Sequence, residues 1–144
     1  MCCLLAACGG SGSGDSNRQQ IQKMFSSVDT EMAKGDYASA CSYFSQRQQT
    51  NIAAGARKAG LNVNSCAGAL TALIKATGIT RAQLAQTFGG ASTPKLKTVN
   101  VQGNQATVTF TDSIGGHAYT ETDALVRENG QWRADRIIKR TTTG

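Results

Sequence analysis

The hydrophobic pattern of this chain changes period once, at Pro94, which is the only proline among its 144 residues. Before Pro94, apolar residues recur at intervals of three and four, which is the spacing of one face of an α-helix. After it, apolar and polar residues alternate, as in a strand with one buried face. A run of helices followed by a run of strands predicts an α+β fold, in which N-terminal helices pack on one face of an antiparallel sheet.

The helical half of the chain contains five segments with recognisable ends. The first segment has one apolar face, formed by Ile21, Met24, Phe25, Val28 and Met32. Ser16 or Asn17 can cap its start, and Gly35 ends it. The other helices are expected after Asp36, over residues 46–58, after Ser65 and over residues 80–88.

Four strands are expected beyond Pro94, over residues 95–101, 106–112, 117–128 and 131–140. In the second strand, Ala106, Val108 and Phe110 alternate with threonines, which gives one apolar and one polar face. The dipeptide Asn129-Gly130 is favoured in a tight hairpin turn, so the last two strands are expected to pair as a hairpin.

Size and composition are those of a globular domain. The chain is 40% hydrophobic and 17% charged, and no apolar run approaches the roughly 20 residues of a transmembrane helix. The sequence therefore predicts one α+β domain over residues 18–141, which is long enough to bury a core.

The net charge of +6 comes from basic residues spread along the chain, with a modest concentration in Arg133, Arg136, Lys139 and Arg140. We interpret this cluster as a solvated strand face, with attraction to anionic lipid head groups as the alternative. Nucleic acid is not an expected partner, because the sequence has no zinc-binding spacing, no basic helix and no basic stretch interleaved with aromatic residues.

The run Leu5-Ala6-Ala7-Cys8 is followed at once by a Gly/Ser-rich stretch. It resembles the lipobox of bacterial lipoproteins, in which an exported precursor is cut just before a cysteine that carries lipid. The resemblance implies a residual signal peptide over residues 1–7, then a lipidated Cys8 and a flexible tether over residues 8–17. Such a protein is exported and contacts the bilayer through Cys8, at the outer face of the cell membrane.

The segment before Cys8 lacks the basic residues and the full apolar stretch of a signal peptide. We therefore expect an incomplete precursor, with its true start upstream. The alternative is a chance Leu-Ala-Ala-Cys at the start of a cytosolic protein, in which no lipid would be attached.

Cys41 and Cys66 are the only cysteines beyond Cys8. They lie on two predicted helices that are expected to face each other, and an exported protein folds in an oxidising compartment, so we expect a Cys41–Cys66 disulfide. The alternative is two buried free thiols. A catalytic or redox thiol is not expected, because no partner arrangement supports one and the chain has no Cys-x-x-Cys.

Three stretches together resemble small actinobacterial lipoproteins of the nuclear transport factor 2-like superfamily, namely residues 37–41, 65–70 and 125–133. The resemblance covers most of residues 21–139. It implies a cone-shaped half-barrel, in which a curved antiparallel sheet of about four strands wraps around helices and leaves a cavity at its open end. The superfamily includes isomerases, cyclases, dehydratases and many non-enzymatic members, so the fold does not decide the function.

Asp112 is the first candidate for acid–base chemistry. Alternation places its side chain on the apolar face of its strand, where it would reach the cavity mouth and have a raised pKa, as an isomerase-like base does. The alternative is that Asp112 caps the turn over residues 113–116. Glu121 and Asp123 share one face of the next strand with His117, and alternation alone does not say whether this face is the concave one.

His117 is the only histidine, so a histidine-based triad or metal site would have to use it. A single histidine makes a weak metal site, and neither a metal nor a cofactor is expected. The alternative for His117 is a hydrogen-bonded or exposed residue at a strand end, and Trp132 is interpreted as a core residue rather than a stacking platform for ligand.

We expect few polar groups to converge on the cavity, and therefore favour a non-catalytic binding or accessory module at the cell envelope. Its partner would be a small apolar molecule in the cavity or an envelope protein on the sheet. The alternative is an isomerase, cyclase or dehydratase that uses Asp112 or His117 as base. The solvated threonines of the second strand favour a monomer.

Overall fold

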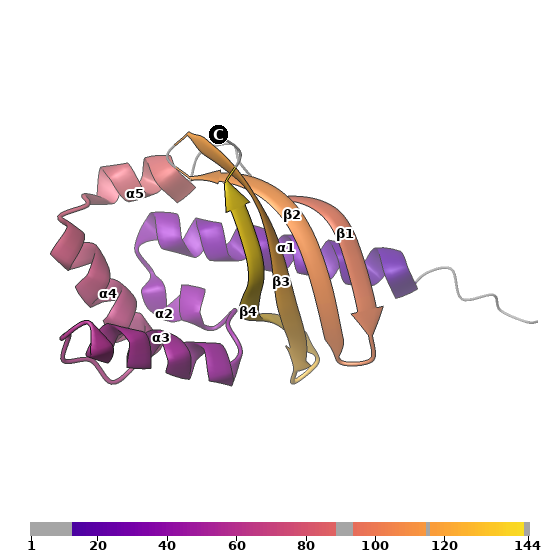
Figure 1. Cartoon of the computed structure of the whole chain (residues 1–144), viewed down its shortest axis with the longest axis horizontal. Helices are drawn as coiled ribbons and strands as arrows, with labels where there is room; N and C mark the ends of the chain where they lie inside the picture. Colours follow the sequence, from indigo (N-terminus) through magenta and orange to yellow (C-terminus); the bar gives the residue numbers. More distant parts are fainter. Residues whose placement is uncertain (1–12, 89–93, 115, 143–144) are drawn as a thin grey trace, which may run out of the picture.

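The computed structural model describes residues 13–88, 94–114 and 116–142, so Cys8 and the expected signal peptide over residues 1–7 lie outside the described residues. Within these ranges the chain forms five helices and then four strands (Figure 1). They are α1 (Ser13–Lys34), α2 (Tyr37–Cys41), α3 (Gln46–Lys58), α4 (Cys66–Thr77), α5 (Arg81–Phe88), β1 (Lys95–Gln102), β2 (Gln105–Ile114), β3 (His117–Glu128) and β4 (Gln131–Thr142). This order confirms the α+β class.

Three helices begin at a side-chain cap. Asp36, Ser45 and Ser65 each accept a hydrogen bond from the backbone N–H three residues further on, which satisfies a donor at the start of α2, α3 and α4. Helix α4 ends at Gly78, whose φ of 68° lies in the left-handed region that favours glycine. The helices expected after Asp36 and after Ser65 are therefore confirmed.

Helix α1 begins at Ser13, so the caps expected at Ser16 and Asn17 are wrong. Asn17 instead lies within the helix and faces the sheet. Its Oδ1 accepts hydrogen bonds from Trp132 Nε1 at 3.2 Å and from Arg127 Nη2 at 2.6 Å. The sequence misplaces this boundary because the first turns of α1 are polar and are held by contacts with two strands that lie far away in the sequence.

The four strands form one sheet in the order β1-β2-β3-β4, and each neighbouring pair is antiparallel. Asn129 and Gly130 join β3 to β4 with φ of 51° and 78°, as a two-residue hairpin turn requires. In β4, Asp135 and Ile138 have no residue directly opposite them on β3, so the strand contains two bulges. Bulges bend a strand and increase its twist, which accounts for the curvature of the sheet in Figure 1.

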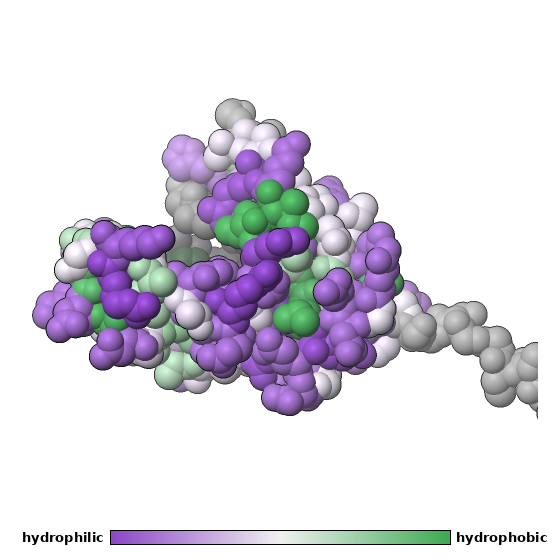
Figure 2. Space-filling view, turned by 60° about the horizontal axis from the view of Figure 1, so that its bottom comes forward, coloured by the Kyte–Doolittle hydropathy of each residue, from purple (hydrophilic) through white to green (hydrophobic). Residues whose placement is uncertain are grey.

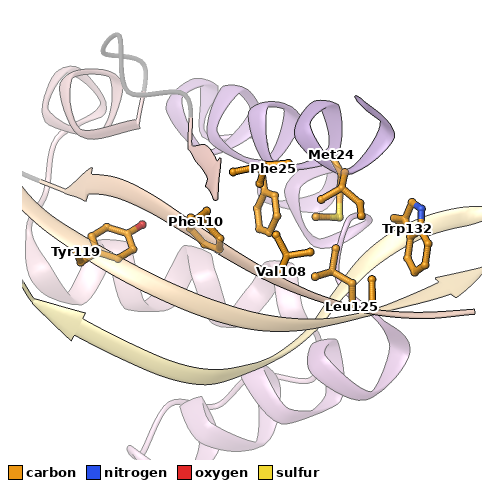
Figure 3. Close-up of a cluster of buried hydrophobic side chains, with 10 residues drawn as sticks. Met24, Phe25, Val108, Phe110, Tyr119, Leu125 and Trp132 are labelled. Atoms are coloured by element: carbon orange, nitrogen blue, oxygen red, sulfur yellow. The ribbon is translucent and has the colours of Figure 1, made fainter. Parts of the chain in front are cut away.

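The core lies between α1 and the concave face of the sheet (Figure 3). The rings of Phe25 on α1 and Phe110 on β2 have centroids 4.7 Å apart. Ile21 and Val108 are completely buried, and Trp132 is a core residue, as expected. Burial of a large aliphatic side chain such as Ile21 contributes about 1.5–3 kcal/mol to the free energy of unfolding. The apolar contact between α1 and β2 therefore holds the helix on the sheet.

Helices α2 to α5 form a second group at one side of the sheet (Figure 1). The disulfide between Cys41 and Cys66 joins α2 to α4, with Cα atoms 6.1 Å apart, as the sequence predicts. It closes a loop between residues that are 25 positions apart, which is worth roughly 3–3.5 kcal/mol in the chain-entropy account.

A buried serine fixes α3 to the sheet. Ser45 is 1% exposed, and its hydroxyl donates a hydrogen bond of 2.6 Å to Asp135 Oδ1. Its backbone N–H donates to the carbonyl of Ala134 at 2.8 Å, and Ala134 N–H donates to the carbonyl of Tyr43. The bulge at Asp135 therefore gives the residues before α3 a place to pair with β4.

The outer surface is mainly hydrophilic, with separate hydrophobic patches on the side that Figure 2 shows. On the convex face of the sheet, Thr107 is exposed, and the hydroxyl oxygens of Thr109 and Thr122 lie 2.9 Å apart. Among the described residues, no helix is both long enough and apolar enough to cross a membrane.

Candidate functional site

A cavity of about 230 Å³ lies between α1 and the concave face of the sheet. It is larger than the roughly 150 Å³ cavity that suffices to bind benzene in an engineered core. Aromatic and aliphatic side chains form much of its wall: Phe25, Val28, Phe44, Phe110 and Ile137. Ile137 is 50% exposed, so the cavity opens to solvent at β4.

Strand register brings polar side chains to one end of this cavity. Tyr119, Glu121 and Asp123 occupy alternate positions of β3 and are all buried, so they share the concave face. Asp112 on β2 lies directly opposite Tyr119, and Arg140 on β4 lies directly opposite Glu121. Polar side chains from three neighbouring strands, β2, β3 and β4, therefore lie on the same wall of the cavity.

Asp112 and Asp29 form the first acidic pair. Tyr119 donates its phenol hydrogen to Asp112 Oδ2 at 3.2 Å, and the backbone N–H of Ser113 donates to Asp112 Oδ1 at 2.7 Å. Asp29 reaches the cavity from α1. Burial, and then the negative charge of Asp112, raise the pKa of Asp29 to about 7. Asp29 is therefore close to half-protonated at neutral pH.

Glu121 and Asp123 form the second acidic pair. Arg140 Nε donates a hydrogen bond to Glu121 Oε2, which makes an ion pair. Asp123 is only 5% exposed, and its Oδ1 has no hydrogen-bond partner among the described residues. Burial, and then the charge of Glu121 and a hydrogen bond to it, raise the pKa of Asp123 to about 8, although Arg140 opposes this shift. Asp123 is therefore mostly protonated at neutral pH.

Tyr119 connects the two pairs. Its ring lies next to Phe110 at the end of the core (Figure 3), and the guanidinium of Arg140 lies 5.0 Å from its centroid. Burial, and then the charges of Asp112 and Glu121, raise the pKa of Tyr119 above its ordinary value. The phenol therefore stays protonated and acts as a hydrogen-bond donor at the cavity wall.

The structure brings together some of the residues that the sequence singles out. Asp112, Glu121 and Asp123 line the cavity, and Asp112 also accepts a hydrogen bond from the N–H of Ser113 next to it. His117 lies at the start of β3, is exposed and does not line the cavity. The expectation that few polar groups converge is wrong, because alternation on β3 and cross-strand pairing place carboxyl, phenol and guanidinium groups on one wall.

Sequence reasoning missed Asp29 and Arg140. Asp29 is four positions after Phe25 and three before Met32, so it lies in the apolar stripe of α1. A carboxyl group in such a stripe is the sequence feature that could have identified Asp29 as a site residue. The sequence places Arg140 in a basic cluster on a solvated strand face. Its partner is set by the register of β3 and β4, which two bulges shift, so no simple alternation rule identifies it.

Other candidate sites are weaker. A second hollow of about 430 Å³ lies beside Trp132 and Tyr43, but Lys23 is its only ionisable group other than Tyr43 among the described lining residues. No three His, Cys, Asp or Glu side chains within the described ranges are grouped so that they could hold a metal ion. The acidic end of the first cavity is therefore the candidate functional site.

Solved structures share this architecture. An NTF2-like protein of unknown function from Shewanella baltica OS155 matches over 93% of this chain and 99% of its own, with a TM-score of 0.55 and 13% identity. An NTF-2-like protein of unknown function from Silicibacter pomeroyi DSS-3 matches over 88% and 99%, with a TM-score of 0.49 and 14% identity. No protein-family model and no curated protein matches the sequence. The chain has the NTF2-like fold, and this likeness extends to the fold alone.

The raised pKa values predict how stability depends on pH. The folded protein keeps protons on Asp29 and Asp123 up to about pH 7 and 8, whereas the ordinary pKa of aspartate is 3.8. Between these values the folded state binds more protons than the unfolded state, so the free energy of unfolding falls as the pH rises. Asp123→Asn removes one such group, and we expect a shallower fall and a variant more stable than wild type at pH 8, by on the order of 1–2 kcal/mol.

Urea unfolding followed by circular dichroism at a series of pH values measures this difference. Asp15→Asn is the matched control, because Asp15 is an exposed carboxyl in the first turn of α1, and its slope should equal that of wild type. An unchanged pH slope in Asp123→Asn would contradict the prediction.

Proposed function

We propose that this protein is an exported lipoprotein, anchored at the outer face of the cell membrane through Cys8, whose single NTF2-like domain is a binding module for a small molecule. The anchoring half of the proposal is supported by the Leu-Ala-Ala-Cys run and the Gly/Ser stretch after it. The Cys41–Cys66 disulfide supports it as well, because such bonds persist in oxidising compartments.

The binding half is carried by one observation: Oδ1 of Asp123, in the wall of an open cavity, has no hydrogen-bond partner within the part of the chain that the structure describes. A buried acceptor without a donor costs about 1–3 kcal/mol. A bound molecule that donates a hydrogen bond there recovers this free energy, while its apolar part contacts Phe25 and Phe110. The exposed Thr107 and the hydroxyl contact of Thr109 with Thr122 on the convex face support a monomer that presents this cavity, with an envelope protein as the alternative partner.

Lipidation is tested by removing the acceptor cysteine. We express the chain behind a basic, apolar leader in a bacterium that processes lipoproteins, and follow partition between detergent and aqueous phases. Wild type should enter the detergent phase, since two or more acyl chains anchor stably. Cys8→Ser should stay in the aqueous phase, and the control Cys3→Ser, which changes a residue of the cleaved segment, should behave as wild type. Detergent partition of Cys8→Ser would contradict anchoring.

Ligand occupancy is tested with two neighbouring isoleucines. Ile137 and Ile138 are 50% and 51% exposed, but only Ile137 lines the cavity. Non-denaturing mass spectrometry of the purified protein should detect a retained small molecule. Ile137→Trp should abolish it by covering the opening, and Ile138→Trp should leave it unchanged. Equal retention in both variants, or no retained mass in wild type across preparations, would argue against binding in this cavity.

A second candidate function is proton transfer at carbon, as in the isomerases of this superfamily. It is favoured by Asp29, whose pKa of about 7 suits a general base at neutral pH, and by the phenol of Tyr119 as a donor on the same wall. The cavity has open volume, and Asp112, the base that the sequence suggests for an enzyme, lines it.

The enzymatic alternative is tested with cyclohex-3-enone, a small β,γ-unsaturated ketone whose conjugated isomer absorbs in the ultraviolet. An isomerase should accelerate conjugation, and Asp29→Asn should lower the rate by about 10²-fold or more, the usual contribution of a positioned general base. Asp15→Asn serves as the control for a surface carboxyl. A wild-type rate no higher than that of acetate at the same carboxylate concentration would reject isomerisation of such ketones.

A further inference from the structure

We propose that the ligand of this cavity is a small organic cation, an ammonium group carried on an apolar body. The proposal rests on the binding function proposed above and names the class of molecule bound. Its ammonium group would lie at the acidic end of the cavity, between the Asp29–Asp112 pair and the Glu121–Asp123 pair. Its apolar body would lie against the aromatic wall.

The charges facing the cavity are unequal. The acidic groups come from three elements, α1, β2 and β3, and comprise Asp29, Asp112, Glu121 and Asp123. The basic groups are Arg136 and Arg140, both from β4. Arg140 is held by Glu121, and Arg136 is exposed at the opening. Among the described lining residues, four carboxyl groups against two guanidinium groups favour a cation over an anion at this end, because a cation can replace the protons that Asp29 and Asp123 hold.

Asp123 supplies the specific recognition. It is 95% buried, and its Oδ1 faces no donor among the described residues. An ammonium group carries three N–H donors and no acceptor. It can satisfy Asp123 Oδ1 and reach a second carboxylate at the same time, whereas a single hydroxyl supplies one donor.

Proton exchange explains how an acidic pocket remains stable when it is empty. In each pair one carboxyl holds a proton near neutral pH, because burial disfavours its charged form and the neighbouring carboxylate repels a second negative charge. An ammonium group provides the same positive charge, so its arrival releases protons from Asp29 and Asp123. Binding should therefore strengthen as the pH rises, while an alkylammonium, with a pKa of about 10, keeps its own charge.

The apolar wall selects the rest of the ligand. Phe25, Phe44 and Phe110 line the cavity, and aromatic faces attract cations as well as apolar groups. The volume of about 230 Å³ accommodates one ring with a short chain, given that roughly 150 Å³ holds benzene.

The test is isothermal titration calorimetry of the purified full chain with three probes of similar shape and different charge. They are 2-phenylethylammonium, neutral 2-phenylethanol and anionic 3-phenylpropionate. The ammonium probe should bind about tenfold or more tightly than the alcohol at neutral pH, which corresponds to about 1.4 kcal/mol. Its affinity should rise from pH 6 to pH 8.5, and titrations in buffers of different ionisation heat should show proton release into the buffer.

Two variant pairs locate the effect. Asp123→Asn should weaken ammonium binding about tenfold or more while changing alcohol binding little, and Asp15→Asn should change neither. Ile137→Trp should block the ammonium probe, and Ile138→Trp should not. Circular dichroism establishes that each variant is folded.

The outcomes separate this inference from the binding function beneath it. Equal affinity for all three probes, or tighter binding of the alcohol or the carboxylate, overturns cation selectivity but leaves the cavity as a binding site. If no probe binds while mass spectrometry still recovers a ligand that Ile137→Trp removes, the ligand class is wrong and the binding function stands. If no probe binds and no ligand is recovered, both fail.

Discussion

The contact between α1 and the concave face of the sheet determines the rest of this structure. Ile21 and Phe25 from the helix cover part of the concave surface, together with Val108 and Phe110 in the same core. A helix that packed along the whole sheet would leave no room for a ligand. Here the apolar contacts gather over part of the strands, and Asp29, one turn beyond Phe25, stands where the packing gives way to a cavity. The helix that builds the core therefore also builds the site.

Strand β3 by itself contributes both to the core and to the site. Along the concave face of β3, Leu125 belongs to the core, and Asp123, Glu121 and Tyr119 follow at successive alternate positions toward the start of the strand. The side chains on this face change from aliphatic to acidic within one strand. The burial that the core requires extends over the carboxyls, and this burial, with the repulsion inside each pair, raises the pKa of Asp123 and of Asp29.

Periodicity in the sequence predicts the order of the elements, the hairpin at Asn129 and the shared face of Glu121 and Asp123, because these depend on neighbours along the chain. It does not predict the meeting of Asp29 with Asp112, which depends on how a helix lies across a sheet. Nor does it predict the pairing of Arg140, which depends on bulges that alternation rules ignore. The fold class can thus be predicted largely from the sequence. The gathering of polar groups in the cavity cannot, because it depends on how distant elements pack together.

The bulges of β4 have a consequence at the edge of the sheet. β4 is an edge strand, and a straight edge offers unpaired N–H and C=O groups that invite a strand from another molecule. Asp135 and Ile138 interrupt this row, the residues before α3 occupy part of it at Ala134, and Lys139 places a charge beside the remainder. The irregularities that curve the sheet around its cavity thereby also disfavour the edge-to-edge stacking that leads to aggregation.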